Sequence, residues 1–352
     1  MAVRVNSLGF TALHNPTFPE LDIVFVHGLQ GHPRRTWTYS DGKDEHLDVN
    51  DAQTGAIKTL KRLFKRRSRN AATPTGSTPS YAGAGGTRPD IFWPEDLLPN
   101  LEACKQARIL TYGYDSRLFD LVKKVNFSEI SSQGETFLNG LARVRADYNN
   151  RPLMFIAHSL GGLLVKIALN ESRKKSTNPT AKDKYDIVNS TFAVIFFGTP
   201  HRGASIADLG LKIIRVAAAA THMSYNPSII KTLDQNSETL KGLRKDFIDT
   251  LDYMITRNNF ESSTFQENQG LSNVPGFKGK VVEDDSSELE RNDRNDHIEA
   301  DHMGMCRFSG SDDPGFAVFS GETGSICQLA HVQRRDTDRG YTGMAFYCQG
   351  HV

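Results

Sequence analysis

The sequence predicts an α/β fold in which a mainly parallel sheet carries helices on both faces. Short apolar runs, typical of buried strands, alternate with segments of helical period through the middle of the chain. The resulting order of strand, helix, strand, helix and strand is typical of parallel sheets. One of these strands also runs directly into a helix through a turn that contains a serine. At 352 residues the chain is long enough for one large domain.

Four apolar runs are expected to be strands of this sheet: 22–26 (DIVFV), 107–114 (ARILTYGY), 152–157 (PLMFIA) and 190–198 (STFAVIFFG). Two helices are expected between them. Residues 130–148 have helical spacing through Phe137, Leu141 and Val144, and residues 160–172 place Leu160, Leu163, Leu164, Ile167 and Ala168 on one face.

Composition divides the chain into four parts. Residues 1–40 begin the α/β domain and 91–315 complete it, with 203–258 expected to form a helical cap over the carboxyl ends of the strands. Residues 41–90 carry the basic block KTLKRLFKRRSR and a low-complexity run, so we expect a disordered insertion. Its basic block could contact anionic lipid or act as a nuclear address. Residues 316–352 show no sustained period, which predicts poor order.

Charge and cysteine usage exclude several classes of function. A net charge of +1 gives no overall electrostatic attraction to nucleic acid, so no nucleic-acid partner is expected. Cys104, Cys306, Cys327 and Cys348 lack CxxC or zinc-ligand spacing, which indicates reduced thiols, no metal site and an intracellular protein. The first residues lack the apolar core of a signal peptide, and no run approaches about 20 apolar residues. We therefore expect a protein that is not secreted and is soluble or at most peripheral.

Residues 154–169, MFIAHSLGGLLVKIAL, place Ser159 at the join of a strand and a helix. In the nucleophile elbow of α/β hydrolases this turn holds the serine in a strained conformation, with its hydroxyl clear of the sheet. The positions two before and two after the serine must be small, and here they are Ala157 and Gly161, the first departing from the usual glycine. Ser159 is therefore the candidate nucleophile.

A serine nucleophile needs a base and an acid, which follow it in this fold in the order acid, then histidine. His201 follows Ser159 too soon to leave room for the acid, and His222 lies in the expected cap. The choice narrows to His297 or His302. We prefer His302, which precedes an apolar patch, and expect His297 to be exposed. Two further histidines fall in the tail, His331 and His351.

The acid should follow a strand between the cap and His302. Glu267 ends the strand-like run STFQE, and Asp284 and Asp285 follow another such run, GKVV, so both alternatives stay open. The oxyanion needs backbone N–H donors, which we expect from Leu160, directly after the nucleophile, and from Leu29 in the HGLQG loop. His27 in this loop is expected to be a hydrogen-bonded structural residue.

Six motifs occur in one order: VFVHGLQGHPRRTW, FWPEDLLP, ARILTYGYDS, FIAHSLGGLLVKIAL, VIFFGTPHRGA and ADHMGMCRF. Over about residues 20–315 the chain resembles the serine-active-site-containing protein family, a lipase-like branch of serine esterases. The resemblance implies an α/β-hydrolase fold, Ser159 and His302 as triad members, and a Phe-x-Glu element matched by Phe265 and Glu267. It also implies lipid metabolism, because family members are linked to phosphatidylglycerol remodelling at contacts between mitochondria and endoplasmic reticulum. The basic insertion and the tail depart from the family pattern.

These observations favour a carboxylic ester hydrolase of the serine esterase or lipase type, or an acyltransferase, acting on lipid-like acyl esters without a cofactor. Ser159 would attack the carbonyl, His302 would relay the proton and Glu267 would orient His302. The alternative is a catalytically silent hydrolase-fold domain that serves signalling or membrane tethering. We expect a cytoplasmic protein, or one peripheral to mitochondrial or endoplasmic reticulum membranes, with a possible contact to anionic membrane. The sequence leaves the oligomeric state open.

Overall fold

The structure is a computed structural model, and it describes residues 3–29, 31–41, 89–116, 127–148, 150–202, 212, 237–270, 279–289 and 294–328. The chain divides into two compact units, residues 1–39 with 90–352 and residues 40–89. The second unit coincides closely with the predicted insertion, but residues 42–88 of it lie outside the described residues. All elements below belong to the first unit.

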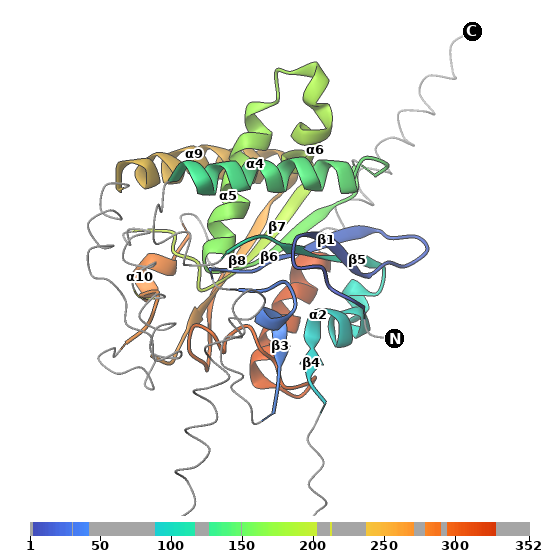
Figure 1. The fold of residues 1–352 in the computed structure, drawn as a ribbon, viewed down its shortest axis with the longest axis vertical. Helices are drawn as coiled ribbons and strands as arrows, with labels where there is room; N and C mark the ends of the chain where they lie inside the picture. The colour runs from blue at the N-terminus through green and yellow to red at the C-terminus, as the bar shows by residue number, and fades with distance from the viewer. Residues whose placement is uncertain are drawn as a thin grey trace, which may run out of the picture. The chain divides into compact units, whose positions relative to one another are not determined.

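A seven-stranded sheet forms the centre of this unit (Figure 1). Its strands, in spatial order, are β1 (Gly9–His14), β5 (Ala107–Gly113), β2 (Leu21–Val26), β6 (Leu153–His158), β7 (Thr191–Phe197), β8 (Glu261–Glu267) and β9 (Asn295–Ile298). Only β1 among them is antiparallel to its neighbour, and all the other pairings are parallel. The mainly parallel sheet and the α/β class are as predicted, and all four predicted strands are present.

Helices cover both faces of the sheet, because the central strands are apolar on both sides. On β2, Val24 and Val26 face a core shared with α4 (Phe127–Val144), α5 (Leu160–Lys174), α6 (Lys182–Ser190) and α9 (Ser237–Asn258). Ile23 and Phe25 face the opposite core, which contains residues of α2 (Trp93–Asp96) and of a helix over 314–328. Figure 1 shows these two layers on either side of the strands.

Short elements complete the described fold. The two-residue strands β3 (Thr38–Tyr39) and β4 (Ile91–Phe92) pair antiparallel as a separate ribbon. The remaining short elements are single turns: η1 (Arg35–Trp37), η2 (Leu98–Asn100), η3 (Glu102–Cys104), η4 (Pro179–Ala181) and α10 (Asp284–Ser287). No helix in the described part of the chain is both long and apolar enough to span a bilayer.

The prediction of a cap over 203–258 was wrong for its last part. Residues 237–258 form α9, which packs on the sheet as the crossover between the parallel strands β7 and β8. Such a connection needs a helix on the sheet face, and Phe247, Leu251 and Met254 accordingly lie in the core. Apart from Lys212, the rest of the predicted cap lies outside the described residues.

Two further segments differ from the sequence prediction. The run GKVV is not a strand; the last strand is β9, and it contains His297. Residues 314–328 form a helix, whereas poor order was predicted from residue 316. Phe316, Phe319 and Ile326 of this helix are buried in the core, where Phe319 contacts Trp93 with ring centroids 4.9 Å apart. Residues 329–352 lie outside the described part.

A buried cluster of charged side chains lies at the amino-terminal ends of the central strands. Asp22 at the start of β2 accepts two hydrogen bonds from Arg108, of 2.7 and 2.8 Å, and others from Arg145 and Arg151. All four side chains are buried. Burial lowers the pKa of Arg145 to about 10, and the attraction of Asp22 opposes this shift. The cluster lies at the opposite end of the strands from Ser159, because Asp22 pairs with Leu153 at the start of β6.

Candidate active site

Ser159 occupies a strained turn between β6 and α5. Its backbone angles, φ 52° and ψ −124°, are rare for a residue other than glycine. The turn is tight on both sides. A Cβ on Gly161 would lie 2.4 Å from the carbonyl oxygen of His27, and a Cβ on Gly28 would lie 2.8 Å from Cβ of Ser159. The small residue that the sequence analysis required after the serine is therefore a steric necessity.

Backbone hydrogen bonds hold this turn against the end of β7. The Ser159 N–H donates to the carbonyl of Phe197 at 2.8 Å, and the Thr199 hydroxyl donates to the carbonyl of Ser159 at 3.1 Å. The Ser159 Oγ itself is buried and makes no hydrogen bond within the described part of the chain. The hydroxyl is thus held in place through its backbone alone.

His302 and Glu267 form a buried pair. The His302 Nδ1 lies 3.4 Å from Oε1 of Glu267, and each side chain is 1% exposed. Glu267 is the last residue of β8, and its Oε1 also accepts the N–H of Val282 at 2.6 Å. A carboxylate in this position can hold the imidazole with its proton on Nδ1, which leaves Nε2 as the base.

The alternative acids lie elsewhere. Asp284 accepts hydrogen bonds of 2.7 and 2.8 Å from Lys280, and Asp285 is exposed in α10. His297 is exposed on β9, with its Nε2 4.0 Å from Oδ1 of Asp284. Among the candidates that the sequence left open, His302 and Glu267 form a buried pair, whereas His297 and Asp284 approach each other at the surface.

The imidazole of His302 packs against the strand ends that carry the serine turn. A Cβ on Gly198, the residue after β7, would lie 3.0 Å from Nδ1 of His302, and Gly198 has a φ of +51° that suits glycine. Nε2 of His302 makes no hydrogen bond within the described residues, so it is not bonded to Ser159 in this state. Catalytic hydrogen bonds are often long in ligand-free enzymes and tighten with substrate.

His158 is a residue of this site to which the sequence analysis gave no role. Its Nε2 donates to the carbonyl of His302 at 2.9 Å, and the two ring centroids are 4.8 Å apart. Burial, with a smaller contribution from His302, holds the pKa of His158 well below its ordinary value, so the ring stays neutral. Its position directly before the candidate nucleophile was the available signal.

His27 fixes the conformation of the loop after β2 through a hydrogen bond and ring stacking. The His27 Nδ1 donates to the carbonyl of Gly28 at 2.9 Å, and the ring stacks on Tyr114 with centroids 4.4 Å apart. Tyr114 also donates its hydroxyl to the His27 carbonyl at 2.8 Å. Burial lowers the pKa of His27 to about 4, so the ring is neutral near pH 7. His27 is a hydrogen-bonded structural residue, as predicted.

Both expected oxyanion donors are close to the serine turn: Leu160 follows Ser159 in the chain, and Leu29 follows Gly28, which packs against Ser159. Leu160 is the first residue of α5, where a helix leaves its N–H groups without intrahelical partners. Leu29 is buried in the loop after β2, whose conformation His27 fixes. In the described part of the chain, no three His, Cys, Asp or Glu side chains gather as metal ligands would.

His201, which lies too close to Ser159 in the sequence to follow the acid, is buried. Its ring packs edge-on against Phe196, with centroids 4.7 Å apart. Burial, followed by the charges of Lys166 and Arg202, holds the pKa of His201 well below its ordinary value.

The parallel sheet with helices on both faces and the strained serine turn define the α/β-hydrolase fold. No family model matches the chain. The chain is 25% identical over 288 residues to the protein SERAC1 of mouse and of cattle, a match that covers 81% of this chain. It spans 36% of the length of these relatives.

Solved structures of low sequence identity are also similar to the chain. A membrane phospholipase A described as a bacterial virulence factor is 9% identical, with a TM-score of 0.39, over 92% of this chain and 82% of that one. The phospholipase PlaB of Legionella pneumophila is 15% identical, with a TM-score of 0.35, over 71% of this chain and 39% of that one.

Proposed function

We propose that this chain is a serine hydrolase that cleaves acyl groups from lipid-like esters or transfers them to an acceptor. Ser159 Oγ attacks the ester carbonyl while Nε2 of His302 takes its proton. The tetrahedral intermediate then collapses, the C–O bond to the alcohol breaks, and His302 gives the proton to the departing alcohol. Water, or an acceptor alcohol, attacks the acyl-enzyme in the same way and frees Ser159.

The buried pair of His302 and Glu267 carries this proposal. A carboxylate and an imidazole that are both 1% exposed are costly to bury without a compensating role. Their place in the fold also fits, because Glu267 ends a strand on the same sheet edge as Ser159, and His302 packs against Gly198 at that edge. Buried polar groups gathered at one edge of a sheet are expected at a catalytic site.

The oxyanion of the intermediate would be bound by the backbone N–H groups of Leu29 and Leu160. Each such donor typically contributes about 10²- to 10³-fold to turnover. His27 and Tyr114 fix the conformation of the loop that carries Leu29 through hydrogen bonds and ring stacking. This rigidity supports the role, since an oxyanion hole must be rigid before the reaction begins.

The substrate class is proposed from resemblance. The sequence motifs resemble the lipase-like serine-active-site family, and this agrees with the 25% identity to protein SERAC1. We therefore propose a lipid-like ester as substrate, lipid metabolism as the setting, and a peripheral contact with the anionic membranes of mitochondrion or endoplasmic reticulum.

A catalytically silent interaction domain is the second candidate. The observation in its favour is that Ser159 Oγ and His302 Nε2 make no hydrogen bond within the described residues. Such a domain would keep the turn and the buried pair but not turn over an ester.

Ester turnover by three proteins separates the two candidates. Wild type should hydrolyse p-nitrophenyl esters, and His302→Ala should lower kcat/KM by several orders of magnitude, because triad members act as a unit. His297→Ala is the matched control, since His297 is exposed on β9. No turnover by wild type would favour the silent domain. A loss in His297→Ala but not in His302→Ala would show that the wrong histidine was chosen.

A further inference from the structure

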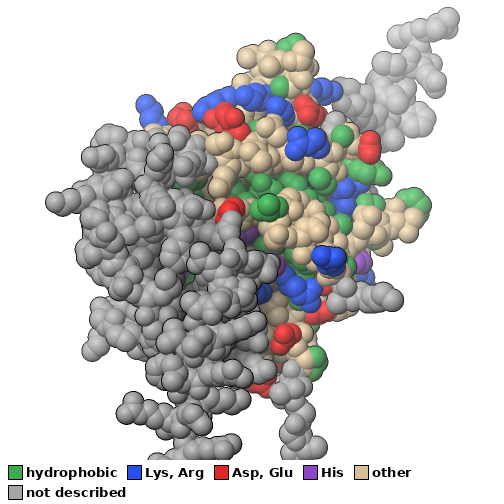
Figure 2. Space-filling view, viewed as in Figure 1, with side chains coloured by type: hydrophobic (Ala, Val, Ile, Leu, Met, Phe, Trp, Pro, Cys, Tyr) green, Lys and Arg blue, Asp and Glu red, His purple; other side chains and the backbone are tan. Residues whose placement is uncertain are grey.

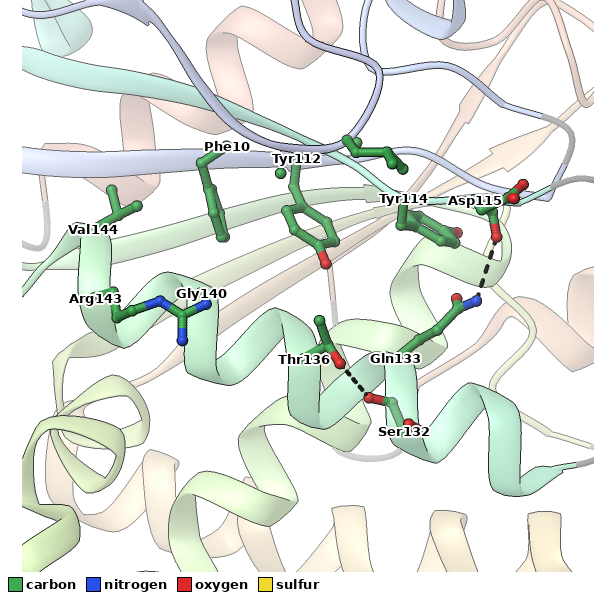
Figure 3. A pocket seen from close by; sticks show the side chains of 13 residues that line it. Phe10, Tyr112, Tyr114, Asp115, Ser132, Gln133, Thr136, Gly140, Arg143 and Val144 are labelled. Atoms are coloured by element: carbon green, nitrogen blue, oxygen red, sulfur yellow. Dashed lines mark hydrogen bonds between the residues drawn. The ribbon is translucent and has the colours of Figure 1, made fainter.

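A groove separate from the catalytic residues lies between the β1–β5 edge of the sheet and helix α4 (Figure 3). Its volume is about 510 Å³, within the range of roughly 300–1,000 Å³ that is common for small-molecule sites. Strand residues line one side, and residues of α4 line the other. In the space-filling view, hydrophobic side chains reach the surface along the lower side of α4 (Figure 2).

Aromatic rings form the strand side of this groove. Phe10 contacts Tyr112 with centroids 4.7 Å apart, and Tyr112 stacks on Tyr114 at 6.0 Å with an interplanar angle of 17°. The hydroxyl of Tyr112 points across the groove toward α4 (Figure 3). Leu8, which is 63% exposed, adds an aliphatic side chain to the same lining. This wall suits an apolar chain or ring.

A glycine on α4 keeps the groove open. A Cβ on Gly140 would lie 3.0 Å from the edge of the Phe10 ring, so any side chain there would enter the groove. Gly134 on the same helix differs, because its Cβ would lie 2.4 Å from Ile167 of the packed helix α5. Packing between helices thus explains Gly134, whereas Gly140, a poor residue in a helix interior, lies directly against the Phe10 ring of the groove wall.

The two ends of the groove carry opposite charges. Arg143, in the last turn of α4, is exposed, and its guanidinium makes no hydrogen bond or ion pair within the described part of the chain. Asp115, which follows β5, lies at the other end, where its carbonyl accepts a hydrogen bond from Gln133 (Figure 3). An anionic ligand group therefore fits the Arg143 end and is repelled at the other.

We propose that this groove binds an anionic amphiphile, namely a free fatty acid, with its carboxylate at Arg143 and its chain against Phe10 and Tyr112. Arg143 offers the planar donor set that carboxylates match. The groove also adjoins the catalytic region, because Tyr114 lines it and stacks on His27. The proposal concerns binding alone and does not depend on the hydrolase activity.

Calorimetric titration with decanoate tests the role of charge. Wild type should bind decanoate more tightly than decanol or decyltrimethylammonium. Arg143→Gln should weaken decanoate binding about tenfold and leave decanol unchanged, whereas Arg257→Gln, an exposed arginine of α9, should change neither. Gly140→Leu should abolish binding by filling the groove. Equal binding of decanol and decanoate, or no effect of Arg143→Gln, would overturn the proposal.

Photolabelling locates the bound molecule. A decanoate that carries a diazirine should label peptides of β1, β5 or α4, and it should do so equally in Ser159→Ala. Arg143→Gln should remove this label, while its circular dichroism spectrum and melting temperature match those of wild type. Labelling confined to other peptides would overturn the proposal, because the fatty acid would then bind at another site.

Discussion

Oε1 of Glu267 lies 3.4 Å from Nδ1 of His302 and at the same time accepts the backbone N–H of Val282 at 2.6 Å. The Val282 N–H therefore anchors the carboxylate while its Oε1 faces the imidazole. Oε2 of Glu267 makes no hydrogen bond within the described residues. The geometry makes Glu267 the carboxylate to test as the acid that orients His302.

Replacing Glu267 with Gln should lower kcat on a short ester by about 10⁴-fold with little change in KM, because the wrong tautomer of His302 would be favoured. The amide keeps an oxygen that can accept from Val282, so folding should be preserved. Asp284→Asn and Asp285→Asn should be mild, since Asp284 pairs with Lys280 and Asp285 is exposed. Normal turnover by Glu267→Gln together with failure of an aspartate variant would transfer the role to that aspartate.

His158 should act as a positioning residue for His302. His158→Phe keeps a ring but loses the N–H that donates to the His302 carbonyl, so kcat should fall by about 10- to 10²-fold. His158→Gln retains a donor and should recover most of this loss. Steady-state kinetics should show the change in kcat rather than KM. Equal losses in both variants, in step with a lower melting temperature, would indicate a purely structural role.

Asp22 should matter for stability and not for chemistry. Asp22→Asn would remove the carboxylate that three buried arginines share, and breaking such a cluster costs about 3–5 kcal/mol. The control is Asp147→Asn, an exposed carboxylate, which should stay within about 0.5 kcal/mol of wild type. Urea unfolding gives both values. An Asp22→Asn protein as stable as wild type would show that the arginines do not need the carboxylate.

Acid should destabilise the fold through its buried histidines. The pKa of His27 is lowered by burial from 6.5 to about 4, so between these values the unfolded chain binds a proton that the folded chain does not. Stability is therefore fully present above pH 6.5 and falls as the pH decreases toward 4, by on the order of 3 kcal/mol for this residue. His158 and His201, whose pKa values are also lowered by burial, act in the same direction.

Urea unfolding at pH 7 and pH 5 measures this effect. The free energy of unfolding should be lower at pH 5, and His27→Gln should show a smaller difference between the two pH values. The exposed His297 is the control, because His297→Gln should keep the full difference. A pH dependence that is unchanged in His27→Gln would show that this histidine is not the group that titrates.

The central strands and the serine turn were predictable because their signals are local. Apolar runs fully buried in a parallel sheet are continuous in sequence, and the join at Ser159 places strand and helix patterns side by side. Strand β1 was not foreseen, since an edge strand such as GFTALH is only partly buried and shows a short alternation. The helix over 314–328 was missed because it has no clean period, although Phe316, Phe319 and Ile326 are buried.

The candidate site residues could be predicted from the sequence to the extent that chain order constrains them. His302 and Glu267 followed from the order of acid and histidine after Ser159, but the sequence could not choose between Glu267 and the aspartates. That choice depends on the pairing of β8 between β7 and β9, which is a long-range property. The hydrogen bond from His158 to His302 spans 144 residues and is invisible in a local pattern.

Active-site labelling is the most direct test of the claim that Ser159 is an activated nucleophile. Wild type should react with a fluorophosphonate probe at one serine, which mass spectrometry should identify as Ser159, and Ser159→Ala should take up no label. Both proteins should have the same melting temperature, because the Ser159 Oγ makes no hydrogen bond in the described part of the chain. Equal labelling of Ser159→Ala and wild type would contradict the account, as would a folded wild type that is not labelled.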